Sequence, residues 1–390
     1  MPQVGSLEAV STVSLARSLV SAAALATALA ACGTEPDVLE LVDPGDTAQS
    51  RGTLLASGVS RMIRDLVWVP GTELVAFART ATTGEGCAIE TVDATSRVVS
   101  QLDGDCGTPG LFEELYFRGL VAAPGGSALY YTAGVGDWRS PERRLHVADP
   151  VGGGTRTLRN GVGPLAVSPD GRHLAFVASG GSPETDSLIV RDLSSGAERH
   201  YADYDGRKGM DGGPVAFSPD GGELLYGQWT SLVGVSLRRV SLGSGAGQTV
   251  TLPAGVFPQL LDWDASGIRA LVNHGSSWHV LNLTTGGSVE VGSLQNGEGR
   301  PYEGWQIGAE SWSADGTRVA YWIGRCFSWR AMFDCGVARY ALLVADTRTG
   351  TRVRVAYTSL EPGRSVFSPD NRRIAYRNYD ADALYVVDVP

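Results

Sequence analysis

The chain has 390 residues and a formal net charge of −10, with 43% hydrophobic and only 19% charged residues. The negative charge and the lack of a basic patch argue against a nucleic-acid-binding surface, which needs clustered Lys and Arg. Length alone would allow two or three domains, whereas the 51 glycines are typical of an all-β protein with many turns.

The chain begins with a predicted export signal. An apolar run, residues 18–31, follows Arg17 and is too short and too rich in Ala for a membrane span, which favours a signal peptide. The run ends in Leu29-Ala30-Ala31-Cys32-Gly33, which resembles the bacterial lipobox, where a peptidase cuts before the Cys and its thiol receives a diacylglyceryl group. The alternatives are cleavage at the same place without lipidation, or a start assigned upstream of the true one.

If Cys32 is lipidated, its acyl chains hold the protein firmly on a membrane, because each buried CH₂ contributes about 0.8 kcal/mol. We therefore expect residues 1–31 to be a lipoprotein signal peptide and residues 32–51 to be a flexible tether. The expected location is the cell envelope, extracytoplasmic and lipid-anchored, on the outer membrane if the host has one.

After the tether, one short pattern recurs to the end of the chain. It is clearest at residues 215–226, where apolar alternation of period two on both sides of Pro219-Asp220-Gly221 predicts strand, tight turn and strand. Pro219 presets φ for a type I turn, Asp220 can bond to nearby backbone, and Gly221 can take the left-handed conformation that closes such turns.

The pattern occurs seven times, at intervals of 46 to 55 residues. We take the closing residues to be Gly71, Gly125, Gly171, Gly221, Gly267, Gly316 and Asn371. Intervals in this range, with short strands and no helical periodicity, indicate propeller blades and not a helical solenoid.

Each unit is completed by three further strands. Residues 173–177 give a second strand, residues 188–192 a third that ends at an Asp, and a Gly-bearing turn leads to a fourth, as at residues 351–355. The seventh unit stops after its third strand, and residues 52–57 are predicted to supply the missing fourth, which removes an open edge. The prediction is an all-β, seven-bladed β-propeller of four-stranded antiparallel blades over residues 52–390.

The Ser-Pro-Asp-Gly repeat resembles that of the TolB-like (PD40, WD40-like) propellers, over roughly residues 52–390. The Gly-His and Trp-Asp pairs of true WD40 repeats do not recur. The resemblance implies the fold and much less about function, because propellers host many unrelated activities.

Four cysteines remain besides Cys32, and an even number in an exported chain indicates disulfides. Of the three possible pairings, we predict the one that joins sequence neighbours, Cys87 with Cys106 and Cys326 with Cys335. A Cys₄ metal site is the competing interpretation, although no Cys-x-x-Cys spacing supports it.

Function on a propeller usually resides in the loops that join second to third and fourth to first strands, because the blades are rigid and these loops vary. Here they carry aromatic and acidic side chains that could bind sugar or peptide at the channel mouth. Alternatively, the aromatic side chains cap the blades. The candidates are Glu113, Glu114, Tyr116, Trp138, Asp203, Tyr204, Asp205, Tyr302, Trp305 and Trp329.

Two chemistries are disfavoured by the same loops. Asp203-Tyr204-Asp205-Gly206 looks like part of a calcium loop but lacks the remaining ligands, so turn chemistry explains it better. Adjacent Glu113 and Glu114 would point to opposite sides of a strand and make a poor acid–base pair.

No Gly-x-Ser-x-Gly nucleophile motif occurs in the chain. The sequence favours a non-enzymatic, monomeric, membrane-tethered scaffold that binds a protein or glycan through its loop face, with no cofactor, metal or nucleic acid. The alternative is a propeller enzyme, a glycan hydrolase or lyase, with carboxylates gathered at the channel mouth.

Overall fold

The structure is a computed structural model in which most of the repeat region can be described. The described residues are 52–58, 65–80, 87–104, 119–133, 144–152, 154–178, 186–204, 215–230, 234–250, 257–264, 267–274, 277–293, 305–331, 334–358, 362–378 and 383–390. Strands are the only regular secondary structure in these ranges, so they contain no helix that could cross a membrane.

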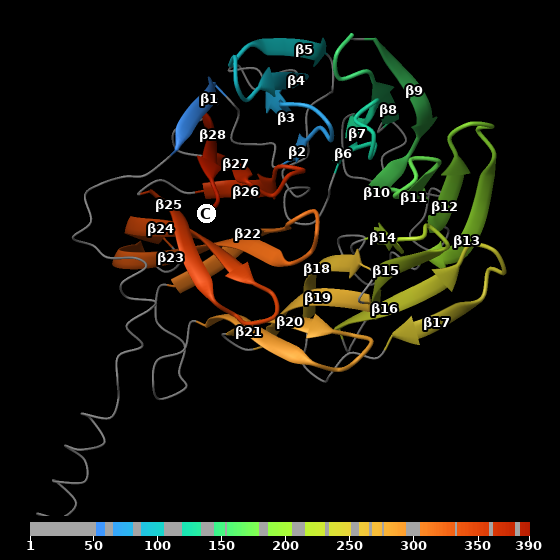
Figure 1. Cartoon of the computed structure of the whole chain (residues 1–390). Helices are drawn as coiled ribbons and strands as arrows, with labels where there is room; N and C mark the ends of the chain where they lie inside the picture. The colour runs from blue at the N-terminus through green and yellow to red at the C-terminus, as the bar shows by residue number, and fades with distance from the viewer. Residues whose placement is uncertain are drawn as a thin grey trace, which may run out of the picture.

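The strands form seven four-stranded antiparallel sheets arranged as a ring (Figure 1). In chain order they are β1 (Thr53–Ser57), β2 (Leu66–Trp68), β3 (Leu74–Thr80), β4 (Cys87–Asp93), β5 (Val99–Asp103), β6 (Leu120–Ala122), β7 (Leu129–Ala133), β8 (Arg144–Ala148), β9 (Thr155–Asn160), β10 (Val162–Val167), β11 (His173–Ala178), β12 (Asp186–Asp192), β13 (Glu198–Tyr204), β14 (Val215–Phe217), β15 (Glu223–Thr230), β16 (Gly234–Ser241), β17 (Gly247–Val250), β18 (Phe257–Asp264), β19 (Gly267–His274), β20 (Ser277–Asn282), β21 (Ser288–Ser293), β22 (Trp305–Trp312), β23 (Arg318–Ala331), β24 (Asp334–Asp346), β25 (Arg352–Thr358), β26 (Pro362–Phe367), β27 (Arg373–Asn378) and β28 (Ala383–Asp388).

Six blades are built from four consecutive strands, and the seventh is built from both ends of the chain. Its order is β1-β28-β27-β26, with Thr53 opposite Val386 and Ser57 opposite Ala383. Figure 1 shows β1 beside β28 at the upper left of the ring. The predicted seven-bladed propeller and its completion by an early strand are confirmed.

The turn between the first and second strands is stabilised by its own side chains. In the fourth blade, Ser218 Oγ donates to Asp220 Oδ1 over 2.6 Å and accepts from the N–H of Glu223 over 2.9 Å. Asp220 Oδ1 also accepts from the N–H of Gly222, and these bonds hold the pKa of Asp220 below its usual range. Gly221 has φ 70°, the left-handed value that the sequence predicted.

Two of these turns differ from the prediction. In the second blade the closing residue is Gly126, with φ 69° and an N–H that bonds to Ala123 O, and not Gly125. In the first blade Gly71 has φ 73° but occupies the third turn position, because the N–H of Thr72 is the one that bonds to Val69 O. A positive φ at the third position is what a type II turn requires.

The turn between the third and fourth strands uses an Asp or Asn at or directly after the strand end, except in the fourth blade, which has Ser241. Asp192 Oδ1 accepts from the backbone N–H groups of Ser194 and Ser195 at 2.9 and 2.7 Å. Hydroxyl groups of the same serines also donate to it, and together these bonds lower the pKa of Asp192. Asn282 and Asp346 accept the same pair of backbone bonds in their blades, so this local chemistry repeats around the ring.

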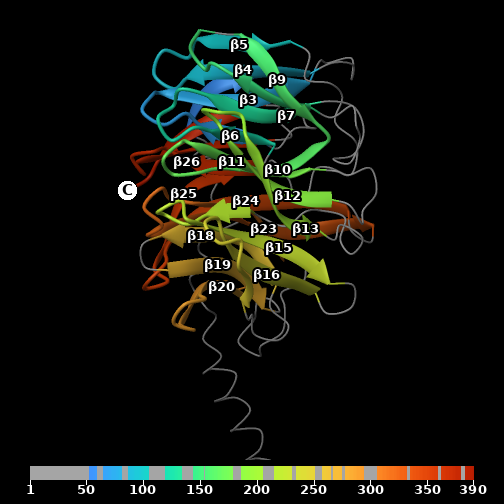
Figure 2. The ribbon, with the colours of Figure 1, turned by 90° about the vertical axis from the view of Figure 1, so that its right-hand side faces the viewer.

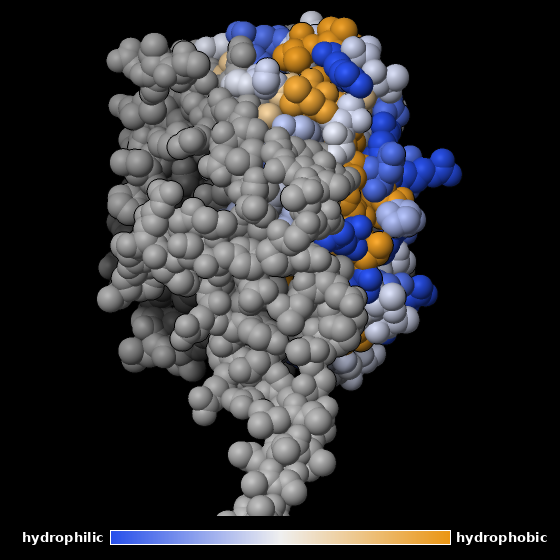
Figure 3. All heavy atoms as spheres, turned by 90° about the vertical axis from the view of Figure 1, so that its left-hand side faces the viewer, coloured by the Kyte–Doolittle hydropathy of each residue, from blue (hydrophilic) through white to orange (hydrophobic). Residues whose placement is uncertain are grey.

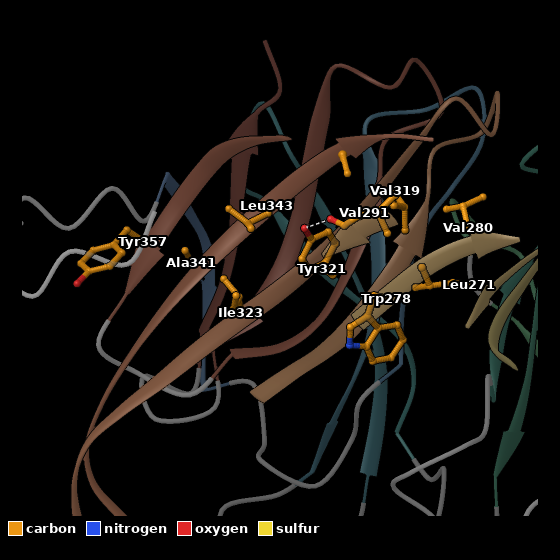
Figure 4. Packing of buried hydrophobic residues seen from close by; sticks show 11 residues of the cluster. Leu271, Trp278, Val280, Val291, Val319, Tyr321, Ile323, Ala341, Leu343 and Tyr357 are labelled. Carbon is orange, nitrogen blue, oxygen red and sulfur yellow. Dashed lines mark hydrogen bonds between the residues drawn. The ribbon is translucent and has the colours of Figure 1, made fainter. Parts of the chain in front are cut away.

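The hydrophobic core lies between blades. Seven clusters of buried side chains occur in the described residues, and each draws its members from two neighbouring blades. Figure 4 shows the one between the fifth and sixth blades, where Leu271 and Trp278 face Val319 and Tyr321. A blade therefore buries its apolar faces only against its neighbours, which makes ring closure a requirement for stability.

Candidate functional site

The ring has two faces that differ in their connections. We call the face with the first-to-second and third-to-fourth turns the turn face, and the opposite one the loop face. On the turn face, connections have two to six residues and most have five, such as residues 168–172 and 193–197. On the loop face, they range from the single residue 161 to the sixteen residues 104–119.

Turn-face backbone groups are largely satisfied within the turns themselves. Ser168, Ser313 and Ser368 repeat the serine-to-aspartate bond of the fourth blade at 2.5 to 2.7 Å. Uniform turns with internal hydrogen bonds leave little variation in backbone length and conformation from blade to blade. The loop face, where length and composition vary, is the candidate site.

Most of the predicted site residues lie outside the described residues. These are Glu113, Glu114, Tyr116, Trp138, Asp205 and Tyr302. The roles assigned to them stay predictions.

Four predicted loop residues belong to strands. Asp203 and Tyr204 end β13, opposite Ser187 and Asp186. Trp305 opens β22, opposite Arg325, and Trp329 lies in β23, opposite Cys335. The assignment of these residues to loops was wrong, because antiparallel backbone pairing continues through segments whose side chains do not alternate in polarity.

Only part of the predicted disulfide pattern falls on described backbone. Cys87 begins β4, and Cys106 lies outside the described residues. Cys326 and Cys335 lie on the paired strands β23 and β24, opposite Ala338 and Trp329 respectively. Both disulfides stay predictions.

An ion pair that the sequence did not reveal joins three blades at the loop-face end of the innermost strands. Asp65 directly precedes β2, and its Oδ1 accepts from Arg364 Nη1 of β26 over 2.7 Å. Its Oδ2 accepts from the backbone N–H of Gly119, directly before β6. The innermost strands surround the ring centre in Figure 1, so the pair holds blades seven, one and two together beside the channel.

Polar side chains are also buried in the two interfaces of the seventh blade. Between blades six and seven, Asn378 Nδ2 donates to Thr358 Oγ1 over 3.3 Å, and the hydroxyls of Ser311 and Ser365 are 3.4 Å apart. Arg377, only 2% exposed, shares the face of β27 that carries Ala375 toward blade one.

Thr358, Arg377 and Asn378 lie at the loop-face ends of their strands, whereas Ser311 lies closer to the turn face. A signal for them exists in the sequence: Arg377 occupies the position where the third and sixth repeats have buried Val177 and Trp322. A charged residue at a repeat position that is apolar in other blades therefore indicates a buried polar group between blades. Within the described part of the chain, no three His, Cys, Asp or Glu side chains gather in a way that could hold a metal ion.

Comparison with known proteins assigns the fold class. No family model and no curated protein matches the chain. Among solved structures, a puromycin-hydrolysing peptidase of Mycobacterium tuberculosis is similar at 16% identity and a TM-score of 0.58, over 87% of this chain and 54% of that one. The β-propeller domain of the Trilobed protease from Pyrococcus furiosus, described as having an open velcro topology, is similar at 10% identity and a TM-score of 0.54, over 86% and 95%.

TolB from Acinetobacter baumannii is also among the similar structures, at 15% identity and a TM-score of 0.42, over 81% of this chain and 79% of that one. The chain spans about half of the peptidase, so that likeness concerns one part of a larger protein. Identities this low show the fold alone, and the protein is a seven-bladed β-propeller.

Proposed function

We propose that the protein is a membrane-tethered, extracytoplasmic β-propeller scaffold that binds a protein or a glycan through its loop face. The observation that carries this proposal is the contrast between the two faces. Connections on the turn face are nearly constant in length, whereas those on the loop face vary from one residue to sixteen. Variation on a rigid support is the usual arrangement of a recognition surface.

Rigidity of that support comes from the interfaces between blades. Seven apolar clusters join successive blades, and β1 joins the last blade to the start of the chain. The Asp65–Arg364 pair fixes the inner strands where loop-face connections begin. A partner that binds there meets a preorganised surface and loses less entropy on association.

The tethering part of the proposal rests on the Leu29-Ala30-Ala31-Cys32 motif. Its test is Cys32→Ser in the bacterial host, with labelled palmitate incorporation and membrane fractionation as readouts. We expect the wild-type protein to be labelled and to sediment with membranes, and the variant to be neither. Membrane retention of an unlabelled variant would contradict the anchor.

The binding part is tested with a photo-crosslinking amino acid placed at single positions. Loop-face positions are Trp138 and Tyr302, and turn-face controls are the exposed Ser195 and Thr285. We expect protease-sensitive adducts of discrete size, or retention on purified peptidoglycan, to depend on the loop-face positions only. Equal crosslinking from both faces, with no peptidoglycan retention, would refute the scaffold.

A further inference from the structure

The chain enters the propeller on the turn face. β1 is the fourth strand of its blade, and Thr53 lies opposite Val386, near the turn-face end of β28. Gly52 fixes this point, because a Cβ there would lie 2.1 Å from Val386 O and its φ is 74°. The C-terminus lies on the same face, at the left edge of Figure 2.

Five large exposed apolar side chains lie in blades six, seven, one and two, the part of the ring that contains this point. They are Leu54 of blade seven (45% exposed), Val98 and Val99 of blade one (61 and 45%), Val151 of blade two (78%) and Val353 of blade six (39%). All five lie at the turn-face end of the outermost strand or in the turn before it. We call them the apolar rim.

The rim is confined to one half of the ring. In the described part of blades three, four and five no large apolar side chain is as exposed. The turn position of Val151 is Ser194 in blade three, Gly243 in blade four and Thr284 in blade five, so the repeat itself does not require an apolar residue there. Figure 3, viewed from the side of β1, shows hydrophobic surface among hydrophilic residues toward the top of the described surface.

A strained residue stands next to the rim. Arg97 has φ 62°, at the turn position where four other blades have a glycine with positive φ. A non-glycine residue in this conformation costs about 1–2 kcal/mol, and such outliers concentrate at functional positions. Arg97 and Arg348, which is 76% exposed, add basic side chains to this half of the face. The carboxylates of this half include Asp93, Asp149, Asp315, Asp346 and Asp370, which are bonded to backbone N–H groups, and Glu73, which pairs with Arg373.

We propose that the apolar rim is a membrane-contact surface, which sets the turn face of blades six, seven, one and two against a phospholipid bilayer and the loop face away from it. This inference rests on the tether of the proposed function. If residues 33–51 form the flexible tether that the proposed function assumes, their end-to-end distance is about 22–26 Å. The strands run from one face of the ring to the other, and an eight-residue strand is about 26 Å long. A tether of this length therefore reaches the membrane more easily from the turn face than by a path around the ring to the opposite face.

The contact follows the physics of peripheral membrane binding. Exposed valines and leucine enter the boundary between headgroups and acyl chains, while Arg97 keeps its guanidinium among the phosphates. Acyl chains on Cys32 hold the protein at the surface, and the rim supplies the second contact that orients it. The loop face is then presented to partners outside the membrane.

The test measures depth in vesicles of phosphatidylethanolamine and phosphatidylglycerol that contain a lipid with a nitroxide quencher on its acyl chain. The acylated full chain carries a fluorescent amino acid at one of three exposed positions: Thr95 beside the rim, Thr285 in the equivalent turn of blade five, or Ser57 at the loop-face end of β1. We expect quenching at position 95 to exceed that at positions 57 and 285 by at least about twofold. Equal quenching at 57 and 95 would overturn the proposal.

A matched variant tests the side chains themselves. Val98→Ala together with Val151→Ser installs the residues that blade three has at these positions, Ala197 and Ser194. We expect quenching at position 95 to fall to the level at position 285, while the protein stays bound through its acyl chains. Unchanged quenching would contradict the assignment of the rim.

A second anchor separates this proposal from the lipidation itself. Residues 33–390 with an N-terminal hexahistidine tag can be held on the same vesicles by a nickel-chelating lipid, which reproduces the tether without acylation. The same order of quenching is expected. If the protein carries no palmitate in the cell, only the native anchor is refuted. If the tagged protein shows no stronger quenching at position 95 than at positions 57 and 285, only the orientation is refuted.

Discussion

Arg364 donates a hydrogen bond to Asp65 across 299 residues of sequence, and the distance between the two atoms is 2.7 Å. The side chains are only 17 and 15% exposed, so water screens this pair much less than a surface pair. The bond lies in the interface where the first and last blades meet. It acts with β1 to close the ring.

Breaking this pair is expected to weaken the closure. Arg364→Met leaves the Asp65 carboxylate without its cationic partner, which should lower the free energy of unfolding by about 2–4 kcal/mol. Urea unfolding followed by Trp fluorescence measures the change. Arg348→Met removes the exposed pair with Asp346 and should cost at most about 0.5 kcal/mol. Equal effects of the two substitutions would contradict a role for the buried pair.

Gly52 and Gly58 flank β1 and provide a matched comparison of backbone strain. Both have φ above 70°, but a Cβ at Gly52 would meet Val386 O, whereas a Cβ at Gly58 would meet nothing within 4 Å. Gly58→Ala should cost about 1 kcal/mol for the left-handed conformation alone. Gly52→Ala should cost at least about 3 kcal/mol, because β1 must also shift away from β28. Similar costs in chemical denaturation would argue against a tight contact there.

An arginine links the turns of successive blades. Arg269, mostly buried, donates to Gly316 O in the next blade and stacks 5.4 Å from the Trp312 ring centre. Arg318, at the equivalent position, donates to Asn371 O over 3.1 Å. These bonds satisfy turn carbonyls that the turn itself does not.

Arg269→Lys is expected to destabilise the protein by about 1–2 kcal/mol, because an ammonium group lacks the planar fork and stacks less well. Thermal unfolding should show a lower Tm. Arg372→Lys, at an exposed turn position, is the control and should leave Tm within about 1 °C. A larger loss in the control would mean that the stacking is not the cause.

Tyr321 makes the stability sensitive to alkaline pH. Burial raises the pKa of its hydroxyl to about 12, and the hydroxyl donates to Val291 O (Figure 4). The unfolded chain loses this proton near pH 10, whereas the folded protein keeps it until about pH 12. Stability is therefore fully present below pH 10 and declines between pH 10 and 12, by roughly 2–3 kcal/mol for this group.

Tyr321→Phe should flatten that decline relative to the wild-type protein. Denaturant midpoints measured at intervals from pH 8 to pH 12 provide the comparison. At pH 8 the variant differs only by the lost hydrogen bond, which serves as the internal control. A wild-type curve and a variant curve that stay parallel up to pH 12 would contradict the assignment.

The fold could be predicted because its determinants are local and repeated. Ser218-Pro219-Asp220-Gly221 specifies a turn through bonds among its own atoms, and the pattern recurs in recognisable form in the other blades. The errors in turn position came from degenerate copies of the pattern. Gly125 and Gly126 both suit the closing position, and only the hydrogen bond from the Gly126 N–H to Ala123 O shows that Gly126 occupies it.

The candidate site was harder to predict, because its residues meet only after the ring closes. Nothing near Asp65 in the sequence points to Arg364, and Asp65 precedes a strand of just three residues. Trp305 and Trp329 were predicted to lie in loops because the neighbouring polar, aromatic and glycine residues do not alternate with the period of two that is typical of a strand. Backbone hydrogen bonds do not depend on side-chain polarity, and they extend β22 to include Trp305 and β23 to include Trp329.

The pairing of β1 with β28 also sets the order of events when the protein is made. β1 and its partner β28 are separated in the sequence by the six other blades, so the seventh blade cannot assemble until all of these have been made. Contacts between such distant segments form slowly, because a very long loop must close first. Blades of four consecutive strands need no such closure, so the sealing of the ring is expected to be the last step of folding.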